Sequence, residues 1–161
     1  MGFSIQVEGM NELIQAMGKL PEQAEKVAAE ALYEGAGVMA DAVSRAVNGI
    51  ATEPFKYAAG GRQRMPSPEE KAILTSAKKG VAKFRKNGVS VQTSVGMQNG
   101  GYAQLNGKTK PVPLIANSIN SGTSFMRKQP FMRKAFSQTK GAAQAAIEAG
   151  IKSREDELKV D

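Results

Sequence analysis

The chain has no cysteine, no histidine and no tryptophan, and only 6% of its residues are aromatic. Without cysteine it can form neither a disulfide framework nor an iron–sulfur site, and without histidine as well the usual zinc sites cannot be built. The same absences exclude Ser–His–Asp and Cys–His nucleophilic catalysis. The sequence therefore predicts no enzymatic activity, no metal and no cofactor.

Long apolar runs are also missing. No run approaches the roughly 18 residues needed to span a bilayer, and the opening MGFSIQVEGM lacks the basic start and apolar stretch of a signal peptide. We therefore expect a protein made in the cytoplasm, with neither a membrane nor a small-molecule substrate among its partners. Its 161 residues suit one domain.

Large apolar side chains are scarce. Leu, Ile, Val and Phe together account for 32 of the 161 residues, which is near the lower limit for a chain that folds by itself. Two interpretations remain open: the chain completes its burial against neighbouring subunits, or it is a small domain with long mobile loops.

Charge is segregated along the chain, whose net charge is +7. Residues 1–54 carry 3 basic and 8 acidic residues, residues 55–140 carry 16 basic and 2 acidic residues, and residues 141–161 carry 3 basic and 5 acidic residues. The basic middle segment predicts a polyanionic or acidic partner, either nucleic acid or the acidic first third of a neighbouring copy.

Apolar periodicity and turn residues predict an α+β fold, in which a small antiparallel sheet packs with a long Ala-rich helix and a C-terminal helix. The expected elements of the first half are a strand over 3–8, a short helix from Asn11, a long helix from Pro21 to Asn48, and a helix from Pro68 to Lys79 capped by Ser67 and Glu70. Those of the second half are a hairpin of 81–86 and 89–97 around Asn87-Gly88, a short strand over 102–105, a short helix near 114–119, and a helix from Pro130 to Ala149 stopped by Gly150.

The domain prediction follows from these elements. Residues 1–150 form one domain with mobile loops at about 50–66 and 106–129, and residues 151–161 form a charged, frayed tail.

Both long helices should each bury one face. The inward stripe of the first is Ala24, Val27, Ala28, Ala31, Gly35, Val38, Met39, Ala42 and Ala46, and that of the second is Phe131, Ala135, Ala142, Ala146 and Ala149. Gly35 and Gly37 should each cost about 1 kcal/mol relative to Ala in a helix. They therefore predict a tight contact or a bend.

Two possible catalytic patterns fail on inspection. Gly107-Lys108-Thr109 is like the end of a phosphate-binding P-loop, but the position that needs the first glycine is Tyr102, and Pro111 prevents a helix where the motif requires one. Glu69 and Glu70, the only acids of the basic segment, are explained by helix capping.

A set of basic residues in the middle segment is the candidate interface or DNA-channel surface. It consists of Arg62, Arg64, Lys83, Arg85, Lys86, Lys108, Lys110, Arg127, Lys128, Arg133 and Lys134. These side chains either contact phosphates or a partner, or form an ordinary solvated face. Aromatic residues that stack on bases are few here, which argues against sequence-specific recognition.

The most distinctive stretch is Gly122-Thr123, a polar loop, and Gln129-Pro130-Phe131-Met132-Arg133-Lys134-Ala135 at a helix start. It resembles the tail-component, or head–tail joining, family of long-tailed bacteriophages. The opening Gly9–Leu13, the Leu20-Pro21 step and Tyr102-Ala103 are similar to that family too, so that the resemblance covers roughly residues 1–150. Two positions depart from its pattern: Asn120 stands where an acid is frequent, and Lys134 where a second proline is usual.

The resemblance implies a structural virion protein, a minor tail or tail-completion protein of the phage neck. Such proteins form homo-oligomeric rings, expected here to be hexameric, around the DNA channel, where they join head to tail beside other neck and tail proteins. Gly122, Thr123, Pro130, Phe131 and Ala135 are the motif residues, with Phe131 expected to be buried and Arg133 to point towards a partner. The alternative interpretation is a small basic protein that binds nucleic acid non-specifically.

Overall fold

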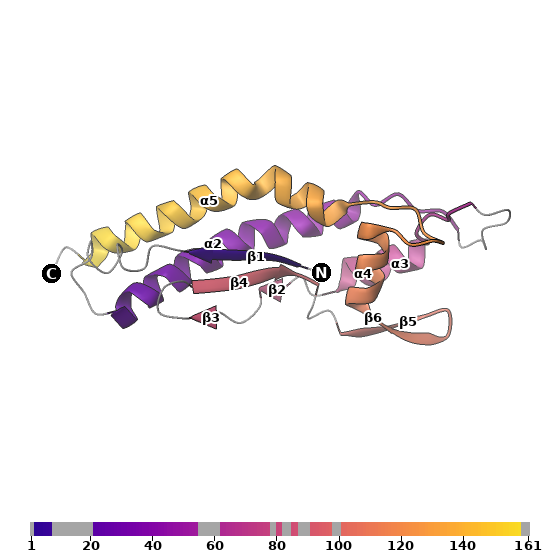
Figure 1. The fold of residues 1–161 in the computed structure, drawn as a ribbon, viewed down its shortest axis with the longest axis horizontal. Helices are drawn as coiled ribbons and strands as arrows, with labels where there is room; N and C mark the ends of the chain where they lie inside the picture. Colours follow the sequence, from indigo (N-terminus) through magenta and orange to yellow (C-terminus); the bar gives the residue numbers. More distant parts are fainter. Residues whose placement is uncertain are drawn as a thin grey trace. The chain divides into compact units, whose positions relative to one another are not determined.

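The computed structural model describes residues 2–7, 21–54, 62–77, 80–81, 85–86, 91–97 and 101–158. In these ranges the elements are β1 (Gly2–Val7), α2 (Pro21–Asn48), α3 (Pro68–Ser76), β2 (Gly80–Val81), β3 (Arg85–Lys86), β4 (Val91–Gly96), β5 (Tyr102–Leu105), β6 (Lys108–Pro111), α4 (Val112–Ser121) and α5 (Phe131–Leu158), as Figure 1 shows. The fold is α+β, with antiparallel strands, a long Ala-rich helix and a C-terminal helix, as the sequence predicted.

The chain divides into two compact units. The hairpin unit comprises Met1–Gly2, Ala40–Gly80 and Gly96–Gln138, and the sheet unit comprises Phe3–Met39, Val81–Val95 and Thr139–Asp161. The boundary falls inside α2 and inside α5, so each long helix contributes one part to each unit.

The sheet unit holds strands in the order β1-β4-β2, with β3 also paired to β4. Along β4, Val91, Thr93 and Val95 are buried while the residues between them are half-buried, which confirms the predicted alternation. Val91 packs into a cluster with Ala24, Val27, Ala28 and Leu32 of α2.

The predicted hairpin between β3 and β4 is confirmed, but its register differs from the prediction. Arg85 lies opposite Gln92 and Lys86 opposite Val91, so four residues connect the paired ends. A two-residue turn at Asn87-Gly88 would pair Lys86 with Val89 rather than with Val91, so the predicted register was wrong. The connecting residues 87–90 lie outside the described part of the chain.

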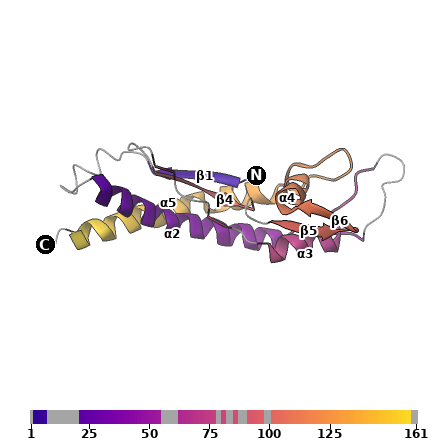
Figure 2. The same cartoon turned by 90° about the horizontal axis from the view of Figure 1, so that it is seen from below.

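In the sheet unit α2 and α5 pack side by side and antiparallel (Figure 2), and small residues permit their approach. A Cβ added at Gly35 would lie 2.5 Å from Cγ1 of Ile147, so the predicted tight contact exists there. Further along, a Cβ at Gly150 would lie 3.1 Å from Cβ of Ala31. At Gly37 such a Cβ would meet no described residue within 4 Å apart from its own helix turn.

The prediction that Gly150 ends the last helix was wrong, because α5 continues to Leu158. Gly150 is needed for close packing on α2, not as a stop signal. Past it, the Arg154 guanidinium lies 2.8 Å from carboxylate oxygens of both Glu30 and Glu34 of α2. Residues 151–158 are thus part of the helix rather than a separate tail, and residues 159–161 lie outside the described ranges.

The buried face of α5 was predicted correctly in its first turns and, later in the helix, at half-buried Ala146. Phe131 and Ala135 are buried, but Ala142 and Ala149 are exposed, and the buried position is Ala143. After Ala135 the buried positions include Ala143 and Gly150, so the buried face of α5 is displaced around the helix from the predicted stripe. On α2 the predicted stripe is buried or half-buried throughout.

The hairpin unit contains a second hairpin that the sequence analysis missed. β5 pairs antiparallel with β6, with Leu105 opposite Lys108. The two turn residues, Asn106 and Gly107, both have positive φ, 51° and 72°, which is the geometry that favours Asn-Gly in two-residue hairpins. Because Gly107 was weighed only as a remnant of a phosphate loop, the signal was overlooked.

The other elements of this unit follow their local signals. Ser67 caps α3 in a capping box with Glu70, as predicted, although the helix ends at Ser76 rather than Lys79. The short helix expected near 114–119 is α4. With β6 and α4 inside it, the segment 106–129 is not one loop. The helix expected after Asn11 lies outside the described residues.

We predict opposite effects for alanine at the two glycines of α2. Gly35→Ala must displace Ile147, and overpacking of this kind costs about 1–3 kcal/mol. Gly37→Ala meets no side chain among the described residues and should stabilise the protein by up to about 1 kcal/mol through helix propensity. Chemical unfolding of both variants checks this, and equal effects would contradict the assigned contact.

A second pair of variants separates core from surface at the start of α5. Phe131 is only 4% exposed, so Phe131→Ala should cost about 3–5 kcal/mol of unfolding free energy. Arg133 is exposed, so Arg133→Ala should change it by no more than about 0.5 kcal/mol. Thermal and denaturant unfolding measure both, and the reverse order would mean that core and surface are exchanged.

Candidate functional site

Two segments that are far apart in the sequence are joined in the hairpin unit. Arg64 and Met126 form a parallel bridge, in which the Arg64 N–H donates to the Phe125 carbonyl at 2.8 Å and the Arg127 N–H donates to the Arg64 carbonyl at 2.9 Å. The Gln63 side chain adds a hydrogen bond to the Thr123 carbonyl at 2.7 Å. Hydrogen bonds therefore connect the segment before α3 to the loop between α4 and α5.

The Gly-Thr pair of the motif shapes this loop. Gly122 has φ +75°, and a Cβ there would lie 3.0 Å from Cβ of Lys128, so a side chain would meet both strain and a close neighbour. The Thr123 hydroxyl accepts hydrogen bonds from the N–H groups of Phe125 and Met126, at 3.1 and 2.9 Å. The Phe125 ring is displayed on a turn that these two residues hold.

Gln129 and Asn120 fasten the other end of the loop, and the sequence analysis assigned neither of them a role. The Gln129 amide bonds the backbone of Ala51 in both directions, accepting from its N–H at 3.0 Å and donating to its carbonyl at 2.9 Å. Buried Asn120 accepts from the N–H of Met132 at 3.0 Å and so satisfies a free donor at the start of α5. An acid at this position, which is frequent in the family that the sequence resembles, would be an acceptor of the same kind and is a signal that could have identified Asn120.

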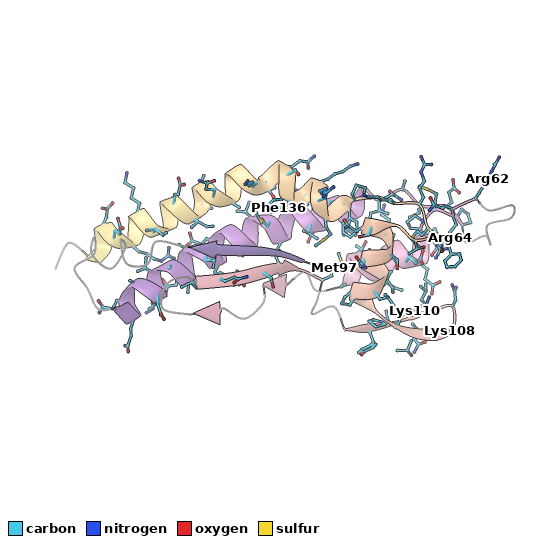
Figure 3. All side chains as sticks on the ribbon, viewed as in Figure 1. Arg62, Arg64, Met97, Lys108, Lys110 and Phe136 are labelled. Atoms are coloured by element: carbon cyan, nitrogen blue, oxygen red, sulfur yellow. The ribbon has the colours of Figure 1, made fainter. Side chains whose placement is uncertain are left out.

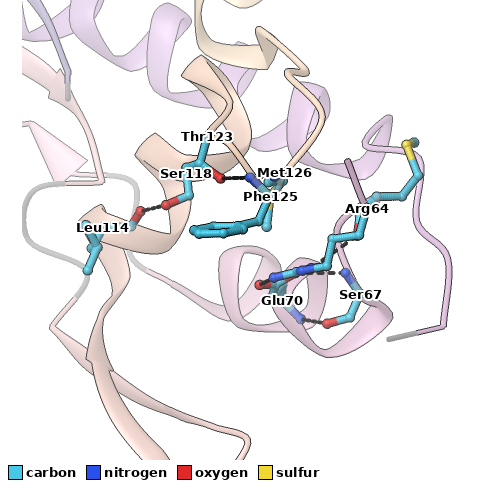
Figure 4. A network of polar contacts seen from close by, with 9 residues as sticks. Arg64, Ser67, Glu70, Leu114, Ser118, Thr123, Phe125 and Met126 are labelled. Atoms are coloured by element: carbon cyan, nitrogen blue, oxygen red, sulfur yellow. Dashed lines mark hydrogen bonds and ion pairs between the residues drawn. The ribbon is translucent and has the colours of Figure 1, made fainter. Parts of the chain in front are cut away.

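Arg64 and Glu70 form a two-pronged ion pair beside this loop (Figure 4). Nη1 and Nη2 of Arg64 lie 2.8 and 2.7 Å from the two carboxylate oxygens of Glu70. The same carboxylate accepts from the Ser67 N–H at 2.8 Å, and its side chain is only 4% exposed, against 19% for Arg64. The pair therefore connects the α3 cap to the bridge at Arg64.

Burial of the Glu70 carboxyl opposes its ionisation, but the hydrogen bonds from Arg64 and Ser67 outweigh burial, so the pKa of Glu70 is lowered from its ordinary value. The positive charge of Lys110 acts in the same direction. The hydrogen bond with Glu70 in turn raises the pKa of Arg64. Both groups are charged at neutral pH.

A groove of about 180 Å³ opens next to the ion pair. Its apolar lining comes from Leu105, Leu114, Ile115, Phe125 and Met126. Arg64, Glu70 and Lys110 contribute its charged groups. Figure 4 places the Phe125 ring between Leu114 and Ser118 on one side and the Arg64–Glu70 pair on the other. Phe125 is nevertheless 72% exposed and Leu114 54% exposed.

The predicted basic set is only partly available for a partner. The Arg64 guanidinium is already paired with Glu70 within the chain. Lys110 lines the groove and Lys108 stands nearby on β6 (Figure 3). Arg62, Arg127, Lys128, Arg133 and Lys134 are exposed and belong to the same unit. Arg85 and Lys86 lie on β3 in the sheet unit, and Lys83 falls outside the described residues.

Among the described residues no cluster of three acidic side chains could hold a metal ion, and in those ranges no helix is long and apolar enough to cross a membrane. No protein-family model, curated protein or solved structure matches the chain.

The lowered pKa of Glu70 gives a prediction for stability against pH. Its ionised form stabilises the fold at neutral pH, and this contribution is lost as the pH falls below the ordinary value of 4.5 and through the lower folded-state pKa. Glu70→Gln removes the ion pair, so at pH 7 the free energy of unfolding of the variant should be lower than that of the parent by about 1–3 kcal/mol. This difference should narrow in acid, where Glu70 of the parent becomes protonated.

Unfolding free energies from pH 7 to pH 3 for the parent and Glu70→Gln test this expectation. Glu69→Gln is the matched control, because Glu69 is the exposed neighbour on the same helix turn. Parallel curves for parent and Glu70→Gln would contradict the stabilising role of the ionised carboxylate.

Proposed function

We propose that the chain is a structural virion protein of the neck or upper tail of a long-tailed bacteriophage, acting as a subunit of a ring around the DNA channel. The observation that supports this most is the exposed Phe125 and Leu114 beside the groove, held by a hydrogen-bonded loop next to Lys110. A fixed apolar and basic surface of this kind suits docking of a protein partner.

The residues of the motif support the same proposal. Gly122 and Thr123 hold the turn that displays Phe125, Gln129 fastens the loop to Ala51, and Phe131 is buried at the start of α5. The resemblance to the head–tail joining family therefore rests on residues with defined structural roles in one unit. Arg133 and Lys134 follow on the exposed side of α5.

A second candidate, non-specific binding of nucleic acid, gains support from one observation. Tyr102 and Phe125 are 75% and 72% exposed in a unit whose described residues include ten basic and four acidic side chains. Exposed aromatic rings among cations can stack on unpaired bases.

The proposed role predicts that the chain is part of the particle. In particles of the virus that encodes it, mass spectrometry should detect the chain and electron cryomicroscopy should place it as a ring at the neck. Arg133→Ala should lower the yield of infectious particles while leaving unfolding unchanged. Lys140→Ala, another exposed cation of α5, is the control and should have no effect.

Binding to DNA separates the two candidates. For a nucleic-acid-binding protein, log affinity should fall steeply and linearly with log salt, and Tyr102→Ala and Phe125→Ala should weaken binding to single strands. Absence of the chain from particles, together with such a salt dependence, would overturn the structural role in favour of the second candidate.

A further inference from the structure

Four large apolar side chains are prominently exposed among the described residues. Tyr102, Leu114 and Phe125 belong to the hairpin unit, and the last two line its groove. The fourth, Tyr33, is 60% exposed and lies on α2 in the sheet unit. The groove of the hairpin unit therefore has exposed apolar walls. In the sheet unit, Tyr33 is a single exposed side chain of similar size to those in the walls.

The surface of α2 around Tyr33 has a second unusual feature. Gly37 follows Tyr33 by four residues, so the two share a helix face. Glycine here costs about 1 kcal/mol relative to alanine, yet a Cβ at Gly37 would meet no described residue within 4 Å apart from its own helix turn. Gly35 packs against Ile147, whereas Gly37 has no such neighbour among the described residues. A flat place beside a projecting ring suits close approach by another molecule.

The helices of the sheet unit and the described residues of the hairpin unit have net charges of opposite sign. The helical residues 21–39 and 139–156 of the sheet unit carry seven acidic and four basic side chains, whereas the described residues of the hairpin unit carry four acidic and ten basic ones. Beside Tyr33 on α2 stand Glu30 and Glu34, whose carboxylates are both bound by Arg154 of the same chain. At the groove Lys110 makes no ion pair with a described residue, although its charge favours the ionised form of Glu70.

We propose that the groove of one copy receives the α2 surface around Tyr33 and Gly37 of a second copy, with Phe125 packing over Gly37. The contact joins two different surfaces, so it is heterologous, and its repetition generates a ring where the rotation closes. The proposal rests on the ring-forming role above and deepens it by naming the two surfaces of the subunit contact. A second copy is the occupant because this chain itself supplies the Tyr33 side chain, the flat surface at Gly37 and helices whose net charge is opposite to that of the hairpin unit.

The absence of cysteine makes a direct test possible. Ala40→Cys places one thiol two helix turns from Tyr33 on the same face, and Ser124→Cys places one beside Phe125, so the side chains proposed to dock are kept. The two variants, one of them carrying a mass tag, are mixed at high concentration and treated with a short thiol-specific bifunctional reagent. Mixed dimers should form, and each variant alone should give few.

The controls define the outcomes of this experiment. Lys140→Cys, on an exposed position of α5, replaces Ala40→Cys and should give no mixed product with Ser124→Cys. Strong self-linking of either variant alone would indicate a two-fold contact and overturn the proposal. Failure to link at any concentration, or equal linking by Lys140→Cys, would overturn it as well.

Matched substitutions then test the named groups. Gly37→Leu should reduce the mixed product by about tenfold or more, whereas Gly141→Leu, equally open on α5, should not. Lys110→Glu should reduce it, whereas Lys108→Glu, on the same strand outside the groove lining, should change it little. Circular dichroism of all four variants checks that they are folded. An unchanged yield with Gly37→Leu and Lys110→Glu would mean that other surfaces make the contact.

The result is independent of the test for a place in the virion. A chain absent from particles that still forms the mixed product would retain the subunit contact and lose the proposed function. A chain present in particles whose groove instead binds an acidic segment of another protein would give no mixed product, and the contact between copies would be lost.

Discussion

The shortage of large apolar side chains is the constraint on which the rest of this structure depends. With few bulky residues to fill space, α2 and α5 stabilise each other by approaching closely, and Gly35 and Gly150 supply the room. Close approach increases the number of van der Waals contacts that small side chains can make. Arg154 completes the pairing with carboxylates at two successive turns of α2, so that it orders the last turns of α5.

In the hairpin unit, hydrogen bonds and an ion pair compensate for the same shortage of large apolar side chains. Loops with few apolar anchors would otherwise be weakly held, because ordering each residue costs conformational entropy. Here Gln129 bonds both backbone groups of Ala51, Asn120 satisfies the start of α5, and Arg64 joins a backbone bridge to a buried carboxylate. Most of these bonds join side chains to backbone, which fixes loop paths without demanding a large core.

Local signals in the sequence were sufficient where one residue type had one geometric role. Ser67 and Glu70 predicted the α3 cap, Pro21 the start of α2, and Gly35 a tight contact. Local sequence signals led to wrong predictions where one residue type can serve two different structural roles. Gly150 predicted a stop although it serves packing. Gly107 was weighed only with Lys108 and Thr109 as a phosphate loop, although with Asn106 it forms a hairpin turn. The roles of Gln129 and Asn120 depend on partners 78 and 12 residues away, which periodicity cannot reveal.

The exposed apolar side chains are notable because the chain has so few large apolar residues. A chain that has few large apolar side chains nevertheless leaves Tyr33, Leu114 and Phe125 exposed, although burying one contributes about 1.5–3 kcal/mol. Phe125 is also held in its exposed position by Thr123, so its display costs ordering as well. Surfaces of this kind are stabilising only when they are covered by a partner, and the net positive charge of the described residues of the hairpin unit favours a partner surface of net negative charge. The proposed second copy of the chain would cover these side chains with no further component, so in this proposal part of the apolar burial occurs between subunits.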